Sequence, residues 1–138
     1  MKFLTPEILA AHLRLDSDAS PEEMALVEVY GNAAESRCEK YLNRRLCVDE
    51  AEAERIAFEA DEFLSGYAEP MGIKLRTSIE NDLHAIAINE NIRAAMLLVA
   101  GHLYRNREEN VTGQGEVAQP LPMGVEYLLH DDRWLGPL

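Results

Sequence analysis

The sequence predicts a mainly α-helical protein, a single-domain helical bundle of about five helices with room for one short strand or hairpin in its middle third. Apolar residues recur at three- and four-residue spacing along most of the chain. A capping residue followed by proline starts the first two helical segments, and glycine and proline gather between later ones. A chain of 138 residues suits one domain with one core, so we expect residues 1–138 to form a single unit.

The first two helices have clear starts. Thr5 suits the N-cap position of the first helix, and the proline after it suits the first helical turn. Ser20 and Glu23 have the spacing of a capping box, which again encloses a proline. We expect the second helix to run from about Pro21 to Asn43, with Glu35 off its apolar stripe.

The middle third, residues 47–88, is an acidic insertion in this interpretation. Glu50 to Ser65 keeps helical spacing and should form a third helix. After a glycine- and proline-containing break, Ile73 to Ile79 alternates apolar and polar residues, as a short strand does. Ser78 is equally suited to cap a short helix that carries Ile79, Leu83 and Ile86, so both alternatives stay open.

The last third contains the most apolar helix, which should begin near Asn89. Its apolar stripe is wide enough to predict burial on more than one side, in part against another subunit. The glycine-containing segment 111–120 is expected to be a flexible loop. A short helix should follow from Pro122, with its inward-facing residues at Val125, Leu128 and Leu129.

The charge balance argues against several classes of function. Against 13 lysines and arginines stand 25 acidic residues, for a formal net charge of -12. Such a surface repels phosphates, which disfavours specific nucleic-acid binding and attachment to anionic membranes. The amino terminus lacks the apolar stretch of a signal peptide, and no segment has the length of a membrane span. Cys38 and Cys47 should be free thiols, which fits synthesis in a cytoplasm.

No catalytic, cofactor-binding or metal site is predicted. The four histidines lie in different segments, and nucleotide-binding and nucleophile-elbow motifs are absent from the sequence. Glu80 and His84 share a helical spacing, and an exposed ion pair explains them better than a metal site does. At the end of the late helix, Arg105, Arg107 and Glu108 either cap the helix or make charge pairs within or between subunits.

Three blocks have a recognisable order along the chain. The first reads LTPE and then AHLRLD in residues 4–16, ahead of the helix that ends at YLNR. The second reads NIRAAMLLVAGHLYRNRE in residues 91–108, and the third reads LPMGVEYLL in residues 121–129, followed by Arg133. In this arrangement the chain resembles the head–tail connector (head completion, or adaptor) proteins of long-tailed bacteriophages. The resemblance covers the first and last thirds and thins over residues 47–88.

The resemblance implies a single connector domain that assembles into a homo-oligomeric ring, a dodecamer. Such a ring lies at the head–tail interface of the virion, between the portal protein and a downstream neck or tail-completion protein, after synthesis in the bacterial host cytoplasm. DNA passes through it without specific binding. The expected interaction and assembly residues are Tyr104, Arg105, Arg107, Glu108, Leu128, Leu129, Arg133 and Trp134.

Two other classes remain as alternatives. An acidic helical protein-interaction module or inhibitor (a DNA mimic) would act as a monomer or dimer on a defined protein target. A helical metal-dependent enzyme is the third class, and the absence of ligand spacings counts against it.

Overall fold

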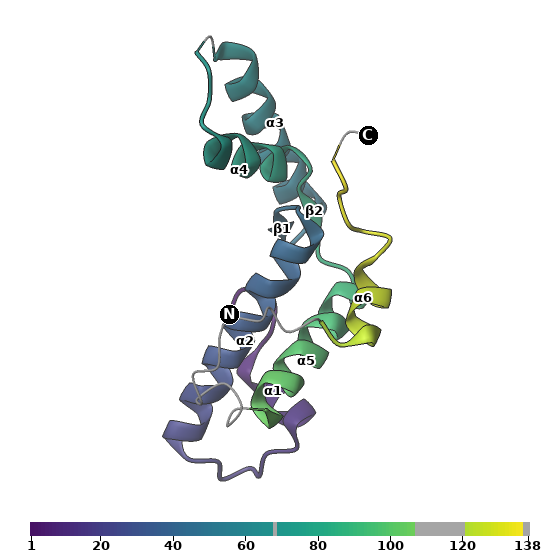
Figure 1. Cartoon of the computed structure of the whole chain (residues 1–138). Coiled ribbons are helices and arrows are strands. Elements are labelled where there is room, and N and C mark those ends of the chain that lie inside the picture. The colour runs from purple at the N-terminus through teal and green to yellow at the C-terminus, as the bar shows by residue number, and fades with distance from the viewer. Residues whose placement is uncertain (68, 107–120, 137–138) are drawn as a thin grey trace.

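The computed structural model describes residues 1–67, 69–106 and 121–136, and this part of the chain is mainly helical (Figure 1). A two-stranded parallel sheet, in which Leu46 pairs with Ile86 and Cys47 with Ala87, interrupts the helices. The flexible loop predicted for residues 111–120 lies outside the described residues. The elements in order are α1 (Pro6–Leu13), α2 (Pro21–Leu42), β1 (Leu46–Cys47), α3 (Glu50–Gly66), α4 (Ile73–Leu83), β2 (Ile86–Ala87), α5 (Glu90–Arg105) and α6 (Met123–Leu129).

The helix starts follow the predicted capping signals. The Thr5 hydroxyl accepts a hydrogen bond from the backbone N–H of Ile8 at 3.3 Å. Ser20 and Glu23 exchange both bonds of a capping box, with N–O distances of 3.2 and 3.3 Å. Asn89 caps α5 in the same way. These bonds satisfy amide groups that have no partner inside the helix, and they confirm the predicted starts of α1, α2 and α5.

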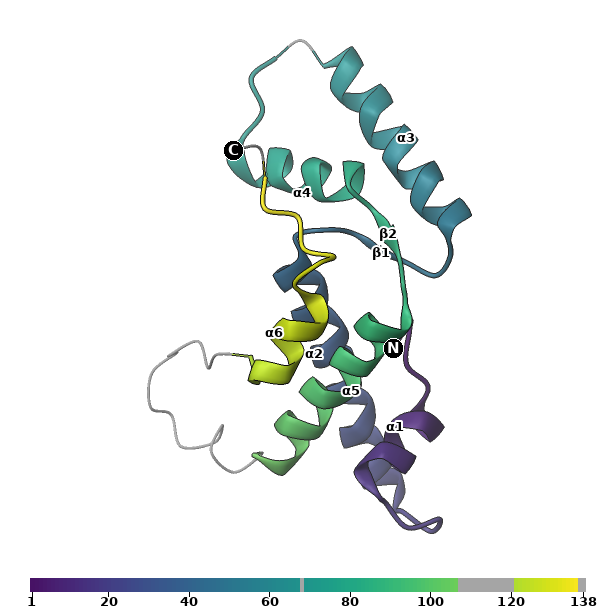
Figure 2. The same ribbon diagram turned by 90° about the vertical axis from the view of Figure 1, so that its right-hand side faces the viewer.

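Four helices, α1, α2, α5 and α6, form the body of the protein. The long helices α2 and α5 pack against each other, and α1 and α6 both lie against α5 (Figure 2). The predicted stripe of α5 is the centre of the core, where Ile92 and Met96 are fully buried. The core that these helices share includes Leu9, Val27, Ala34, Cys38, Leu42, Ile92, Ala95, Met96, Val99, Ala100, Val125 and Leu129.

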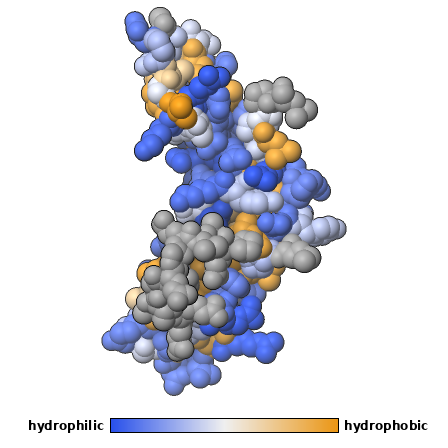
Figure 3. Space-filling model, viewed as in Figure 1, coloured by the Kyte–Doolittle hydropathy of each residue, from blue (hydrophilic) through white to orange (hydrophobic). Residues whose placement is uncertain are grey.

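The helices α3 and α4 form an arm that projects from the body (Figures 1 and 2). They pack against each other, and α3 also contacts both strands. The strand pair stands where the chain leaves the body and returns to it. Apolar side chains are visible on the surface of the arm as well as polar ones (Figure 3). Because α3 and α4 pack mainly on each other and on the two strands, the arm is joined to the rest of the molecule mainly at its base.

The two alternatives for residues 73–86 were both wrong in detail. The segment from Ile73 is helical, so no strand forms at Ile73 to Ile79. The helix starts after Gly72 and not after Ser78, and Ile86 lies in the strand that follows. The spacing of apolar residues did not indicate this helix because the first turns of α4 are exposed on all sides. Ile73, for example, is 85% exposed. Without one buried face, a helix has no reason to show helical periodicity.

None of the helices in residues 1–67, 69–106 and 121–136 combines the length and the apolar character that crossing a membrane requires.

Leu129 and Tyr127, both on α6, provide a test of the core. Leu129 is fully buried and Tyr127 is 84% exposed. We expect Leu129→Ala to lower the free energy of unfolding by about 3 kcal/mol, because it leaves a cavity in a close-packed core. The matched control Tyr127→Ala should change it by less than about 0.5 kcal/mol. Urea unfolding followed by circular dichroism measures both, and equal losses would contradict this packing.

Candidate assembly surface

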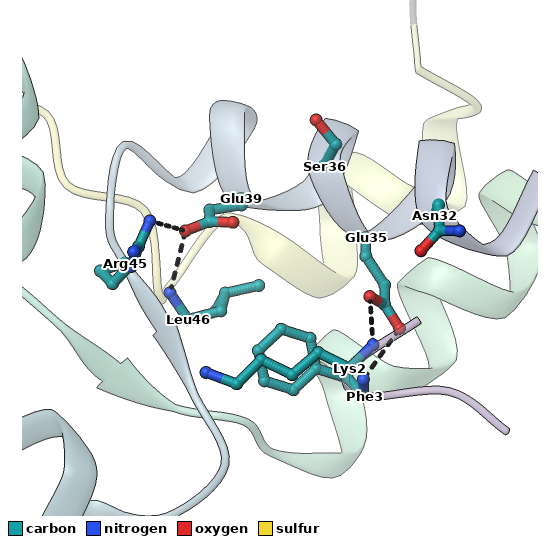
Figure 4. Close-up of a pocket in the computed structure, with 8 residues that line it drawn as sticks. All are labelled: Lys2, Phe3, Asn32, Glu35, Ser36, Glu39, Arg45 and Leu46. Carbon is teal, nitrogen blue, oxygen red and sulfur yellow. Dashed lines mark hydrogen bonds and ion pairs between the residues drawn. The ribbon is translucent and has the colours of Figure 1, made fainter. Parts of the chain in front are cut away.

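The amino-terminal segment is held against the body by a buried carboxylate. Glu35 on α2 is 8% exposed, and it accepts hydrogen bonds from the backbone N–H groups of Lys2 and Phe3 (Figure 4). A third bond comes from the backbone N–H of Leu4, and each of the three N–O distances is 2.8 Å. Three donors offset much of the cost of removing a carboxylate from water. Glu35 lies off the apolar stripe of α2 in the sequence, and no local signal marks it as buried.

A second acid continues this contact toward the arm. The Lys2 ammonium lies 2.9 Å from Glu52 on α3, and the other oxygen of Glu52 accepts a bond from the Val48 N–H at 2.7 Å. That backbone bond, followed by the bond from Lys2, holds the pKa of the Glu52 carboxyl below its usual range. The amino-terminal segment therefore touches both the body and the base of the arm.

The chain between α2 and β1 is the junction of body and arm. Asn43 ends α2 in a left-handed conformation with φ of 53°, which asparagine tolerates better than most residues do. The Arg44 guanidinium donates to the carbonyl oxygens of His84 at 2.7 Å and Asp132 at 3.1 Å. Arg45 lies near two carboxylates, 3.7 Å from Glu39 and 3.8 Å from an oxygen of Asp82. Consecutive residues thus connect α2, the end of α4 and the carboxy-terminal segment.

The carboxy-terminal segment closes over this junction. The Trp134 ring stacks on the His84 ring with centroids 3.7 Å apart, and its backbone N–H donates to the Leu42 carbonyl at 2.8 Å. The Asn43 amide donates to the Trp134 carbonyl at 3.2 Å. The Arg133 guanidinium lies 4.5 Å from the centroid of the Tyr41 ring, a cation–π contact. We call residues 132–134 with these partners the clasp.

The predicted assembly residues have different positions in the subunit. Arg133 and Trp134 belong to the clasp, and Leu129 is buried in the core. Tyr104 meets Tyr30 edge to face at 6.0 Å, and Arg105 donates to the Gly101 carbonyl at 3.2 Å. Leu128 is partly buried against the core. Arg107 and Glu108 lie outside the described residues.

Two of the sequence blocks noted above meet in space. A Cβ built on Gly101 of α5 would lie 3.2 Å from Nε2 of His12 on α1. A side chain at position 101 would displace the imidazole by a few tenths of an ångström, so glycine suits this close approach of α1 to α5. His12 of the first block and Gly101 of the second block are therefore parts of one packed contact between α1 and α5.

The arm exposes several large apolar side chains. Phe58 is 64% exposed, Phe63 45% and Leu75 46%. Phe63 stacks on Tyr67 at 5.3 Å, and a groove of about 350 Å³ runs between α3 and α4. Large apolar side chains exposed on a projecting element are typical of protein contact surfaces. Residues 50–65, with Phe58 and Phe63, were predicted to be helical, whereas the alternation around Leu75 indicated a strand, and no local signal showed that these side chains are exposed.

The titratable groups offer little chemistry. Both cysteines are buried and free, and burial raises the pKa of the Cys38 thiol to about 12. Across residues 1–67, 69–106 and 121–136, histidine, cysteine and acidic side chains form no group of three that could hold a metal ion. The expected ion pair of Glu80 and His84 is wrong, because Glu80 pairs with Arg76 at 2.9 Å while the His84 ring stacks on Trp134.

Comparison with known proteins found one family. The model of the family described as Phage gp6-like head-tail connector protein matches residues 8–133, which leaves out the first seven and the last five residues. The matched range includes residues 47–88, where the resemblance in sequence was thinnest. Neither the curated proteins nor the solved structures contain a match.

Removal of the buried acid should detach the amino-terminal segment. We expect Glu35→Ala to lower the free energy of unfolding by about 2–3 kcal/mol, because it leaves three backbone N–H groups without their acceptor. Glu28→Ala, an exposed site on the same helix, is the control and should change it by less than about 0.5 kcal/mol. Urea unfolding and amide hydrogen exchange at residues 2–4 measure the two effects. Unchanged protection of these amides would show that Glu35 does not hold the segment.

The clasp should weaken as pH falls. Burial, and then the charge of Arg44, lower the pKa of His84 below its ordinary value near 6.5. The unfolded chain therefore binds this proton more readily than the folded one, so the stability of the clasp is complete above about pH 6.5 and is lost as pH falls through the lowered pKa.

Trp134 is the only tryptophan, and its fluorescence reports this step. We expect a transition centred below about pH 6.5 that is absent in His84→Gln, while His130→Gln, at an exposed site, keeps it. A midpoint above that value would contradict the assigned surroundings of His84.

Proposed function

The chain belongs to the Phage gp6-like head-tail connector family, and from that premise we propose that it forms a ring between the capsid portal and the tail. As a member of this family it is a structural protein and not an enzyme. The observation that carries the proposal is the family match over residues 8–133. A protein that connects head to tail lies at the head–tail interface of the virion. We expect it to be present there as a ring of twelve subunits, a dodecamer.

The arm is the structural feature that best supports assembly. In a subunit that acts alone, aromatic residues exposed on a projecting helix pair, such as Phe58, would favour aggregation. In a ring, each subunit uses one surface to contact the next copy and a different surface to contact the previous one. An arm that reaches away from its own body is suited to such a contact.

The charge of the chain supports passage of DNA through the ring. With a net charge of -12, the subunit as a whole repels a phosphate backbone, so a channel lined by its acidic residues would not retain DNA. We propose that DNA passes through the ring without specific binding during packaging and ejection. The assembled protein should accordingly have low affinity for duplex DNA even at low salt.

The portal protein and a downstream neck or tail-completion protein are the proposed partners. Among the predicted assembly residues, Tyr104, Arg105, Leu128, Arg133 and Trp134 lie at or near the surface of the body and the clasp. Arg107 and Glu108 are proposed on the sequence alone. Leu129 serves assembly only indirectly, since its buried side chain holds α6 in place.

The mass of the assembled protein tests the ring. We expect native mass spectrometry and light scattering, over rising protein concentration and with the purified portal protein added, to show a closed oligomer of one size, a dodecamer. The physical reason is that a contact between two different surfaces repeats until the rotation closes. A monomer or dimer under all these conditions would contradict the ring and favour an acidic interaction module or inhibitor.

A further inference from the structure

The arm is attached to the body along a narrow base. Beyond the strand pair, the base includes two bonds to the end of α4, one from Arg44 to the His84 carbonyl and one from the Arg45 N–H to the Asn81 carbonyl. Together these contacts form a short row where the chain leaves the body and returns to it. Such a row resists separation of two parts better than it resists rotation of one about the other.

Within the part of the chain that the structure describes, the arm helices share no buried core with the body. Their buried side chains are those of Ala53 and Ala60 on α3 and of Ile79 on α4. None of the three belongs to the buried cluster that forms the core of the body, whereas Leu46 of β1 belongs to it and Ile86 of β2 packs against it. The base is therefore anchored in the core, and the two helices beyond it are held by contacts at their sides.

Exposed ion pairs form one set of these lateral contacts. Lys2 lies 2.9 Å from Glu52 of α3, and Arg45 lies 3.8 Å from Asp82 of α4. The exposed fractions of these four side chains range from 26% to 54%. Water and salt screen attraction between charges that are this exposed, so the ion pairs restrain the arm only weakly.

The clasp is the second lateral contact, and it lies on the other side of the base from the amino terminus (Figures 1 and 2). The ring of Trp134 stacks on His84, the residue that follows α4, and both side chains are half-buried. The backbone N–H and carbonyl of Trp134 are both bonded to the end of α2. The Asp132 carboxylate accepts a bond from the Asn89 amide at the start of α5 at 2.8 Å. The Trp134 ring therefore links the arm to a segment that is bonded to the body at two places.

A groove separates the clasp from the outer part of the arm. It has a volume of about 540 Å³, and its lining includes Leu64, Met71, Leu83, His84 and Trp134. The first three side chains are half-buried, so closing the groove would remove further apolar surface from water. The groove thus offers the arm room to turn toward the carboxy-terminal segment and a gain in burial when it does so.

We propose that the arm is hinged at its base and that the clasp locks it, so that loss of the stack between Trp134 and His84 lets the arm turn and close the groove. Closure of one packed unit on another about a short connection is a common form of conformational change. In the ring proposed above, a neighbouring protein that draws residues 132–134 away would thereby move the arm. That last step rests on the proposed function, whereas the hinge and its lock do not.

The distance between two spin labels tests the lock. Ser65→Cys near the end of α3 and Tyr127→Cys on α6 are exposed sites, and because both native cysteines are buried, the labels attach to the introduced thiols. In the otherwise unmodified chain, double electron–electron resonance should give one narrow distribution of distances. Trp134→Ala should widen it and add a population at shorter distance, because the arm is then free to turn. His84→Ala, which removes the stack from the side of the arm, should have the same effect.

Two matched variants separate the clasp from other contacts. Leu135→Ala alters a neighbouring side chain that is 73% exposed, and Lys2→Ala removes the ion pair with Glu52, so both should keep the narrow distribution. An unchanged distribution in both Trp134→Ala and His84→Ala would overturn the lock, as would equal widening in Lys2→Ala. Widening toward longer distances alone would overturn closure of the groove. Circular dichroism should show the same helix content in all variants.

Dilution of the labelled chain with an excess of unlabelled chain makes the result independent of the ring. Each distance is then measured within one subunit, whatever the size of the assembly. A locked arm in Trp134→Ala chains that form rings would overturn the hinge and leave the ring intact. A hinged arm in chains that stay monomeric would support the hinge and contradict the ring.

Discussion

The short parallel pairing of Leu46–Cys47 with Ile86–Ala87 is the constraint on which the rest of the structure depends. It brings together the point where the chain leaves the body and the point where it returns, so everything between them must project as an arm. Two strands of two residues are too few to be stable by themselves. The pair persists because α3 packs on both strands and because Arg44 connects α2 to the end of α4 and to the carboxy-terminal segment. The orientation of the arm is thus set by the few residues that follow α2.

The helices could be predicted from sequence because their signals are local. A capping box needs two residues three positions apart, and both Ser20 and Glu23 are visible in the sequence. The strand pair could not be predicted, because its partners are separated by the whole arm and each strand is too short to show alternation. The start of α4 was missed for a related reason, since Gly72 offers no side chain to cap it and Ile73 is exposed.

The candidate site shows the same division between local and distant information. Glu35 has the sequence context of a solvent-exposed glutamate on a charged helix, and only the distant amino-terminal segment, which gives it three donors, makes it a buried acid. Trp134 stood out as the only tryptophan, but nothing in the sequence linked it to His84. Leu129 could be predicted as inward-facing, and its burial in the core follows from the packing of α6 against α5.

The blocks that carry the resemblance to connector proteins lie mainly in the body of the subunit. His12 and Gly101 show this directly, since they lie in close contact between α1 and α5, with the imidazole 3.2 Å from the position that a Cβ at residue 101 would take. Residues that maintain a core identify a fold and its class of assembly, whereas the choice of neighbour depends on what is exposed. The acidic arm exposes apolar side chains, among them Phe58 and Ile73. Substitutions at exposed positions of the arm would therefore leave the core of the body, and with it the features that mark the family, unchanged.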